Sequence, residues 1–374
     1  MNLRNSIDDT FDYDVIIVGC GPAGSVTARY IRPSKHNLRV LLIDRRKKIG
    51  LPVQCGEGIL SFVEGQEIGS STQDKKDLFE CPERVKTHRI DRLQMVTPKH
   101  KIIEFPVQGY TINRDAFDQY LAQRAQEEGA ILKNRISFLG FKDKHTITTN
   151  MGEITGNVIV GADGAFSSVA KSCGLQPPQK LAKCVIAKIK GDFNDHTMKV
   201  FYGKMFNRGY GWIFSKGDHA NVGLGFELYG KTIKTGNTLR KLLDDFIKKE
   251  LSVKGSNILF RGGGIVPVGG PIPRTVKDNV LIVGDAAGMV FPPSGGGIDS
   301  AMIAGRECGN AIWRYYKLGE DLNNYEIKWR NILESDFKKG LRIKKILKLM
   351  TRYNTTCELF FLILKNSGLT RLFM

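Results

Sequence analysis

The hydrophobic pattern at the start of the chain predicts a strand, a glycine turn, a helix and a second strand. Residues 14–18 are an apolar, β-branched run, and a glycine-rich stretch, 19–24, follows at once. Residues 25–31 are compatible with a helix, and a second apolar run, 39–43, ends at Asp44. Short apolar runs separated by a helix are typical of a parallel sheet with helices on its faces.

The rest of the pattern predicts a second kind of sheet inserted into the first. Residues 158–160 and 279–283 are buried-type strands that each run into a glycine turn. Between them, short strand-like runs from 185 to 226 precede a helix at 238–251, as in an antiparallel sheet. We therefore predict an α/β fold: a three-layer, Rossmann-like domain, an inserted antiparallel-sheet domain and a helical C-terminal tail.

One long segment has a weaker pattern. Residues 50–112 look irregular, with four prolines and short strand-like runs only at 92–96 and 102–105. A helix is expected directly afterwards, at 114–128, with Asn113 as its N-cap.

Composition narrows the class of protein. A chain of 374 residues with 41% hydrophobic residues is long enough for two or three folded domains. We expect neither a secretory signal nor a membrane-spanning helix, because the first ten residues are polar and no apolar run reaches 18 residues. Seven scattered cysteines without a Cys-x-x-Cys pair argue against a disulfide framework or a metal site and favour the reducing cytoplasm.

The glycine turn predicts a dinucleotide site. Gly19 permits a tight turn, Gly21 lets the backbone approach a diphosphate, and Gly24 lets helix and strand pack closely. A carboxylate at Asp44, at the end of the second strand, is placed to accept hydrogen bonds from a ribose. The predicted nucleotide contacts of this unit are Gly19, Gly21, Pro22, Ala23, Gly24, Asp44 and Arg45.

Three further elements resemble the FAD-binding set of the glutathione-reductase-like flavoproteins, which include aromatic hydroxylases. They are Gly161-Ala162-Asp163-Gly164, the Gly284-Asp285 turn, and Arg114 at the start of its helix. The resemblance implies FAD as cofactor, Asp285 near the ribityl chain, Arg114 near the diphosphate, and contacts from Ala162, Asp163, Gly164 and Gly284. Taken singly, each acid is equally compatible with a capped turn.

Three more motifs are similar to those of the geranylgeranyl reductase family, whose enzymes saturate isoprenoid double bonds. They are residues 53–58, 210–214 and 292–298, and the similarity extends from about residue 14 to 309. The family's aromatic motif ends in Phe-Pro, whereas Ser215 follows Phe214 here. The resemblance implies that Pro292, Gly295, Gly296, Gly297 and Ile298 flank the flavin.

Two groups of residues are candidates for the reaction itself. Tyr210, Trp212 and Phe214 alternate along a strand, so they share one face and form either a substrate pocket or an ordinary core face. Most isolated cysteines are inert, but the motif match makes Cys55 a candidate proton donor. The same match implies that Cys55 and Gly56 both contact the flavin. Glu57 either tunes that thiol or is a solvated turn acid.

The resemblance favours an FAD-dependent reductase that saturates C=C bonds of geranylgeranyl chains in membrane lipids or their precursors. An aromatic monooxygenase and an electron-carrier flavoprotein remain the alternatives. Because we find a single dinucleotide fingerprint, electrons are expected from an external donor: NAD(P)H, ferredoxin or another carrier. The expected domains are an FAD-binding domain in two parts, 10–175 (with the irregular segment 50–112) and 266–314, a substrate domain at 176–265, and a basic helical region at 315–374.

The formal net charge of +18 needs an explanation, and the tail offers one. Residues 338–353 contain seven basic residues, no acid, and a helical stripe of Ile343, Ile346, Leu347 and Met350. Such a helix either lies on an anionic membrane surface or packs its stripe on the protein. We expect a peripheral position on the cytoplasmic membrane face, and no motif indicates nucleic-acid binding.

Overall fold

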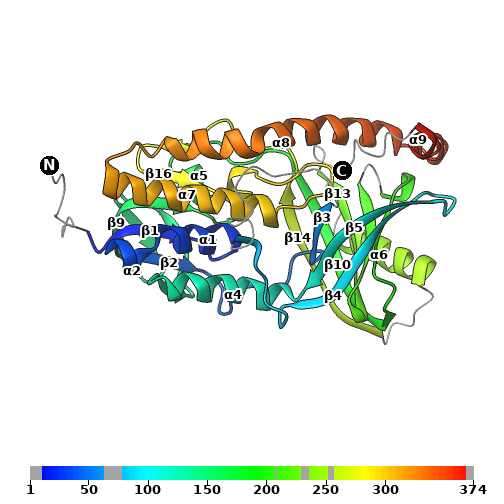
Figure 1. Cartoon of the computed structure of the whole chain (residues 1–374), viewed down its shortest axis with the longest axis horizontal. Helices are drawn as coiled ribbons and strands as arrows, with labels where there is room; N and C mark the ends of the chain where they lie inside the picture. Colours follow the sequence, from blue (N-terminus) through cyan, green and yellow to red (C-terminus); the bar gives the residue numbers. More distant parts are fainter. Residues whose placement is uncertain (1–10, 63–77, 207–208, 229–235, 252–256, 368–374) are drawn as a thin grey trace.

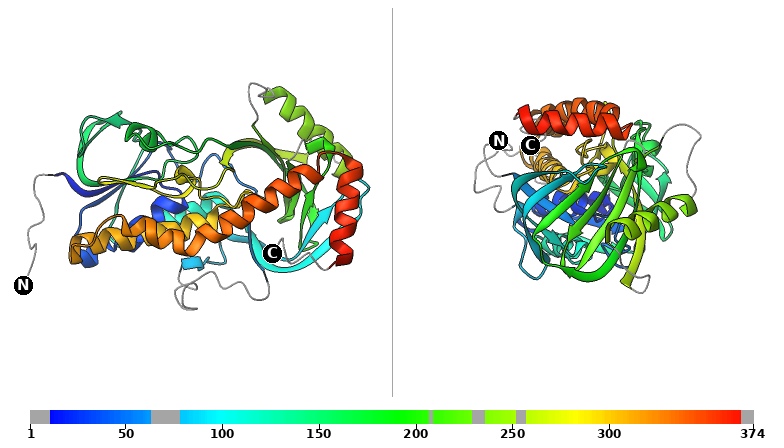
Figure 2. Two further views of the ribbon diagram at one scale, coloured as in Figure 1. Left: turned by 90° about the horizontal axis from the view of Figure 1, so that it is seen from above. Right: turned by 90° about the vertical axis from the view of Figure 1, so that its right-hand side faces the viewer.

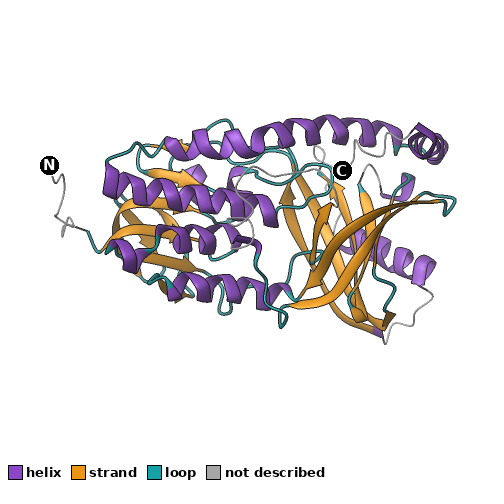
Figure 3. Ribbon diagram, in the orientation of Figure 1, coloured by secondary structure: helices purple, strands orange, loops and turns teal. Residues whose placement is uncertain are grey.

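The computed structural model describes residues 11–62, 78–206, 209–228, 236–251 and 257–367. Two eight-stranded sheets lie at opposite ends of the molecule, and long helices run along it (Figure 1). Figure 3 separates the two ends clearly: stacked helices and strands at one, and a strongly curved sheet at the other. The predicted fold class is confirmed.

The first sheet is the predicted parallel sheet. Along its main path the strands are β15 (Val276–Lys277), β16 (Val280–Ile282), β9 (Gly152–Gly161), β1 (Tyr13–Val18), β2 (Val40–Asp44) and β6 (Ile131–Asn134), and β7 (Phe138–Phe141) and β8 (Thr146–Thr149) extend it through β9. β1 pairs in parallel with β2 and β9, and every residue of β2 is buried. The fully apolar strands therefore occupy the centre of the sheet.

Three helices cover this sheet. α1 (Pro22–Ile31) packs between α4 (Arg114–Glu127) and α7 (Ile298–Leu318). The short helix α2 (Pro33–His36) contacts α1, and α5 (Ser168–Ser172) contacts β7 and β9. All ten residues of α1 are buried, because the helix is covered on several sides.

The second sheet combines two separate parts of the chain. Its spatial order is β14 (Ile258–Pro267), β10 (Leu181–Phe193), β13 (Gly217–Glu227), β12 (Tyr210–Ser215), β11 (Thr197–Phe201), β4 (Lys86–Val96), β5 (Ile102–Ile112) and β3 (Gly58–Phe62). All pairings are antiparallel except that of β11 with β4, which is parallel. That parallel pair joins the two parts.

The expectation of an irregular segment at 50–112 was wrong for 58–62, 86–96 and 102–112, which form strands, whereas 63–77 lie outside the described residues. β4 and β5 are long strands that pair with each other, and β4 also pairs with β11, far away in sequence. Pro106 is tolerated inside β5 because it lies opposite Arg92, next to a shift in the strand register. The domain boundaries given above remain predictions.

The helical tail connects both ends. α8 (Asn324–Met350) buries Tyr325 and Trp329 in the core of the first sheet, and Ile343 and Leu347 in a cluster on the second sheet. α9 (Asn354–Ser367) then turns across the end of the molecule (Figure 2). α6 (Gly236–Leu251) packs on the second sheet through Phe246. No helix in the described ranges is long and apolar enough to cross a membrane.

Candidate active site

The glycine turn after β1 has the shape of an anion site. A Cβ on Gly19, whose φ is +105°, would collide with the Ala162 carbonyl, and one on Gly24 would collide with the Gly19 carbonyl. In contrast, no heavy atom lies within 4 Å of the position of a Cβ on Gly21. α1 begins here without a side-chain cap, so its first N–H groups face this open space.

Asp44 lies at the end of β2, beside this turn. Its Oδ2 accepts a hydrogen bond from the Cys20 N–H (2.9 Å), and its Oδ1 accepts one from the Arg46 N–H (2.7 Å). The carboxylate is only 6% exposed and is held in one orientation. The Asp44 carboxylate is therefore suited to accept a hydrogen bond from a ribose hydroxyl. The neighbouring Arg45, also a predicted nucleotide contact, is exposed.

The two other acidic turns differ from each other. Asp163 accepts hydrogen bonds from Ser167 Oγ (2.6 Å) and from the Ser168 and Val169 N–H groups (2.7 and 3.1 Å), so it caps α5. The Asp163 carboxylate is thus a capping residue, which is one of the two roles that the sequence left open.

The carboxyl group of Asp285 is buried instead. Burial raises the pKa of Asp285 to about 6, although Arg114 opposes the shift.

Asp285 faces the start of α7. The position of a Cβ on Gly297 is 3.3 Å from Asp285 Oδ1, and Gly297 precedes α7 without capping it by a side chain. The loop before it closes on itself, since the Phe291 N–H donates to the Gly296 carbonyl (2.8 Å). Two uncapped helix starts, a fixed carboxylate and exposed glycine backbone together fit a flavin nucleotide.

Glu57 forms the centre of a buried polar network. Lys216 Nζ donates to Glu57 Oε2 at 2.7 Å, and its side chain is 1% exposed. Asn221 Nδ2 donates to the same oxygen (3.1 Å), and the Arg114 N–H donates to Oε1 (3.0 Å). Glu57, rather than the expected Asn113, therefore caps α4, since Asn113 makes no side-chain cap. The reading of Glu57 as a solvated acid was wrong, because a buried lysine neutralises it.

Asn221 connects this network to Cys55 and to the aromatic strand. Its amide donates to the Cys55 carbonyl (2.9 Å) and accepts from Trp212 Nε1 (3.0 Å). Sequence reasoning missed Asn221 and Lys216. An asparagine at a buried position of an apolar strand was the one available signal.

Cys55 lies beside a fixed cation. Its sulfur accepts a hydrogen bond from the Glu57 N–H (3.2 Å) and interacts with the Arg114 guanidinium. Burial disfavours the charged guanidinium, but Asp118 and Cys55 together raise the pKa of Arg114 above its ordinary value. Arg114 Nε donates to Asp118 Oδ1 at 2.7 Å, which fixes the cation in place.

The aromatic residues of β12 share one face, as predicted from their alternation. The ring centroids of Tyr210 and Trp212 are 5.8 Å apart, and those of Trp212 and Phe214 are 6.1 Å apart. A Cβ on Gly56 would come within 3.0 Å of the Phe214 ring, and one on Gly223 would collide with Trp212. The aromatic row and the Cys55–Glu57 turn are therefore in direct contact, and Trp212 is 4% exposed.

Tyr210 brings the third motif to the same place, because its hydroxyl donates to the Ser294 carbonyl in the loop before α7. The structure thus gathers the three motifs that are far apart in sequence.

Known proteins resemble this chain over nearly its whole length. The family described as "Geranylgeranyl reductase catalytic domain" matches residues 181–266, and "Lycopene cyclase protein" matches residues 14–201. Digeranylgeranylglycerophospholipid reductases from Methanococcus aeolicus and Methanocaldococcus jannaschii are each 33% identical, over 92% and 91% of this chain and 88% of their own.

Solved structures agree. A geranylgeranyl bacteriochlorophyll reductase-like protein from Thermoplasma acidophilum has a TM-score of 0.81 at 26% identity, covering 93% of this chain and 90% of that chain. A flavin-dependent brominase, at 20% identity and a TM-score of 0.72 over 96% and 92%, shares the fold.

Fold, site and relatives define a flavin-dependent oxidoreductase. The chain belongs to the digeranylgeranylglycerophospholipid reductase family.

The buried ion pair predicts a specific pattern of stability. Lys216→Met leaves the Glu57 carboxylate buried without its counter-ion and should lower the free energy of unfolding by about 3 kcal/mol. Adding Glu57→Gln should restore part of this loss, as measured by chemical denaturation of the double variant. Lys142→Met breaks the exposed pair with Glu153. It should leave the denaturant concentration at the midpoint of unfolding unchanged. Equal midpoints for Lys216→Met and Lys142→Met would contradict the role of the pair.

Proposed function

We propose that this protein is an FAD-dependent reductase that saturates the C=C bonds of geranylgeranyl chains in membrane lipids or their precursors. The 33% identity to digeranylgeranylglycerophospholipid reductases over 92% of the chain carries the proposal. The contact between the Cys55–Glu57 turn and the aromatic row of β12 supports it, because an isoprenoid chain needs an apolar wall beside a proton source.

Distinct residues would hold FAD. The diphosphate would lie at the start of α1, against Gly19, Gly21, Pro22, Ala23 and Gly24. The adenosine ribose would bind Asp44 and Arg45, and the turns at Ala162–Gly164 and Gly284–Asp285 would line the middle of the cofactor, with Arg114 nearby. Pro292 and Gly295–Ile298 would lie against the flavin ring, where the N-terminus of α7 favours negative charge.

The residues of the chain then divide the reaction between them. When bound and reduced, FAD supplies a hydride to one carbon of the alkene. Cys55 donates the proton to the other carbon, and Gly56 keeps the turn close to the aromatic row. Glu57 holds the turn, since its two oxygens accept hydrogen bonds from Lys216, Asn221 and Arg114. Tyr210, Trp212 and Phe214 form the wall that aligns the chain and excludes water.

Electrons must come from outside the chain. The part of the chain that the structure describes provides one recognised nucleotide turn, so we propose a donor that visits transiently: NAD(P)H, ferredoxin or another carrier. To identify the donor, each candidate is mixed anaerobically with the flavin-loaded protein, and reduction of the flavin is monitored by its absorbance.

Lipid mass spectrometry tests the function. Dithionite-reduced protein, incubated anaerobically with digeranylgeranylglyceryl phosphate, should add hydrogen in steps of two per double bond. Stoichiometric oxygen consumption with an oxygenated product would instead indicate a monooxygenase, and unchanged lipid would favour an electron carrier.

The role of Cys55 predicts a defect confined to alkene reduction. In Cys55→Ser, the rate of single-turnover lipid reduction should fall by about 100-fold, a typical contribution of a general acid. The flavin spectrum and its reduction by dithionite should stay normal, which separates this defect from misfolding. Cys173→Ser, at a half-buried cysteine after α5, is the matched control. A full rate of lipid reduction in Cys55→Ser would show that the proton comes from elsewhere.

We further propose that the tail places the enzyme on the cytoplasmic face of an anionic membrane. Ile343, Leu347, Cys357, Phe361 and Leu364 face the protein. A different set is exposed at the end of α8 and along α9: Ile346, Leu349, Tyr353, Leu359, Leu362 and Ile363. Arg342, Lys345, Arg352 and Lys365 are exposed as well, so this part of the chain presents both apolar and basic side chains to solvent.

Vesicle binding tests this surface. Wild type should sediment with vesicles of anionic phospholipid in low salt and dissociate as salt is raised. Leu349→Ser/Leu362→Ser should weaken binding about tenfold, because two exposed apolar contacts are lost. Leu318→Ser removes an equally exposed leucine at the end of α7 and should have no effect. Absence of sedimentation by wild type in low salt would reject the proposal.

A further inference from the structure

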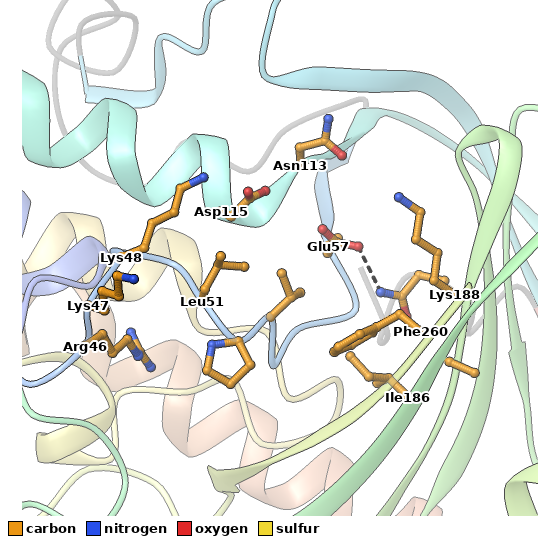
Figure 4. Close-up of a pocket in the computed structure, with 14 residues that line it drawn as sticks. Arg46, Lys47, Lys48, Leu51, Glu57, Asn113, Asp115, Ile186, Lys188 and Phe260 are labelled. Atoms are coloured by element: carbon orange, nitrogen blue, oxygen red, sulfur yellow. Dashed lines mark hydrogen bonds between the residues drawn. The ribbon is translucent and has the colours of Figure 1, made fainter. Parts of the chain in front are cut away.

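A cavity of about 650 Å³ lies next to the buried polar network and includes Glu57 and Asn221 in its lining. It is bounded on one side by the loop after β2 and on the other by strands β10 and β14. Figure 4 shows Arg46, Lys47 and Lys48 on the loop side and Lys188 on the strand side, with Leu51 between them. Its size is within the range of small-molecule sites.

The rim of this cavity carries four cations. Within the described ranges, none of Arg46, Lys47, Lys48 and Lys188 forms an ion pair. The lining includes two carboxylates, and the one at Glu57 is already neutralised by Lys216. Asp115 therefore faces four cations, so the cavity favours an anion.

Apart from Asn113 and Asn221, the rest of the lining is apolar. It includes Leu51, Pro52 and Val53 from the loop, and Ile186 and Phe260 from the strands. Leu51 and Phe260 are each 38% exposed, although both are large apolar side chains. A ligand with an anionic end and an aliphatic part would cover this surface and pair with its rim.

The cavity and the proposed reaction site lie along the same face of the second sheet. Lys188 lies opposite both Asn221 and Phe260, and Ile186 lies opposite Gly223, on which Trp212 packs. Cross-strand neighbours point to the same face, so the rim is one residue pair away from Trp212.

We propose that this cavity binds the phosphate of the isoprenoid lipid, with Arg46, Lys47, Lys48 and Lys188 around the phosphate. The first part of the chain then lies on Leu51, Val53 and Ile186 and leads towards Cys55. The inference rests on the proposed function. The aliphatic lining favours a prenyl chain over a nicotinamide dinucleotide, whose riboses are polar.

The test compares lipids with and without the phosphate. For wild type, kcat/KM should be higher for digeranylgeranylglyceryl phosphate than for neutral digeranylgeranylglycerol. In Lys48→Gln/Lys188→Gln, which removes one cation from each side, this preference should fall at least tenfold. Lys144→Gln/Lys328→Gln, at exposed lysines outside the cavity, should keep it.

A binding measurement keeps the test independent of turnover. The probes are the saturated analogues diphytanylglyceryl phosphate and diphytanylglycerol, titrated calorimetrically in detergent against flavin-loaded protein. If wild type binds the phosphate lipid more tightly than the neutral lipid, and the cavity variant does not, the site is supported. This result would hold even if no alkene reduction were found and the proposed function failed. Equal preference in wild type and the cavity variant overturns the site.

Competitors distinguish the sources of phosphate. Inorganic phosphate should displace the phosphate lipid weakly. A different result would overturn the proposal: NADPH binds wild type but not the cavity variant, while lipid binding is the same in both. The cavity would then be a dinucleotide site.

Discussion

The position of the candidate site depends on the buried ion pair between Glu57 and Lys216. A carboxylate that is 7% exposed must be neutralised and hydrogen-bonded, and here every partner comes from a different element. Lys216 joins β12 to β13, Asn221 belongs to β13, and Arg114 starts α4. The Cys55 turn is therefore held by the second sheet and by α4, which packs against α1.

A second constraint holds the loop on the other side of the site. α8 passes so close to this loop that a Cβ on Gly340 would lie 2.7 Å from the Phe291 ring and 3.0 Å from Pro292. Tyr210 holds the loop from the sheet side by donating to Ser294. The tail thus has a structural part in the site whatever its outer surface binds, because α8 closes one wall of it.

Local signals were sufficient for the nucleotide turn but not for the second sheet. The turn at Gly19 and the acid at Asp44 depend on residues close in sequence, so they could be read directly. β4 lies between β5 and β11, and β11 is about a hundred residues away, so no local pattern records that second pairing. Lys216 and Asn221 likewise acquire their roles only from a partner, Glu57, that is about 160 residues away.

The positive charge of the chain therefore has more than one physical meaning. In the tail, Lys344 and Lys348 lie 3.5 and 3.7 Å from Glu227, so part of the basic helix holds α8 to the second sheet. Lys216 is buried and forms an ion pair with Glu57 inside the protein. A cation that has an internal partner adds little to the external field, whereas the exposed lysines of the tail and of the cavity rim contribute fully. A net charge alone does not identify an anionic partner. Cations without ion pairs that gather around apolar surface are the evidence that one binds there.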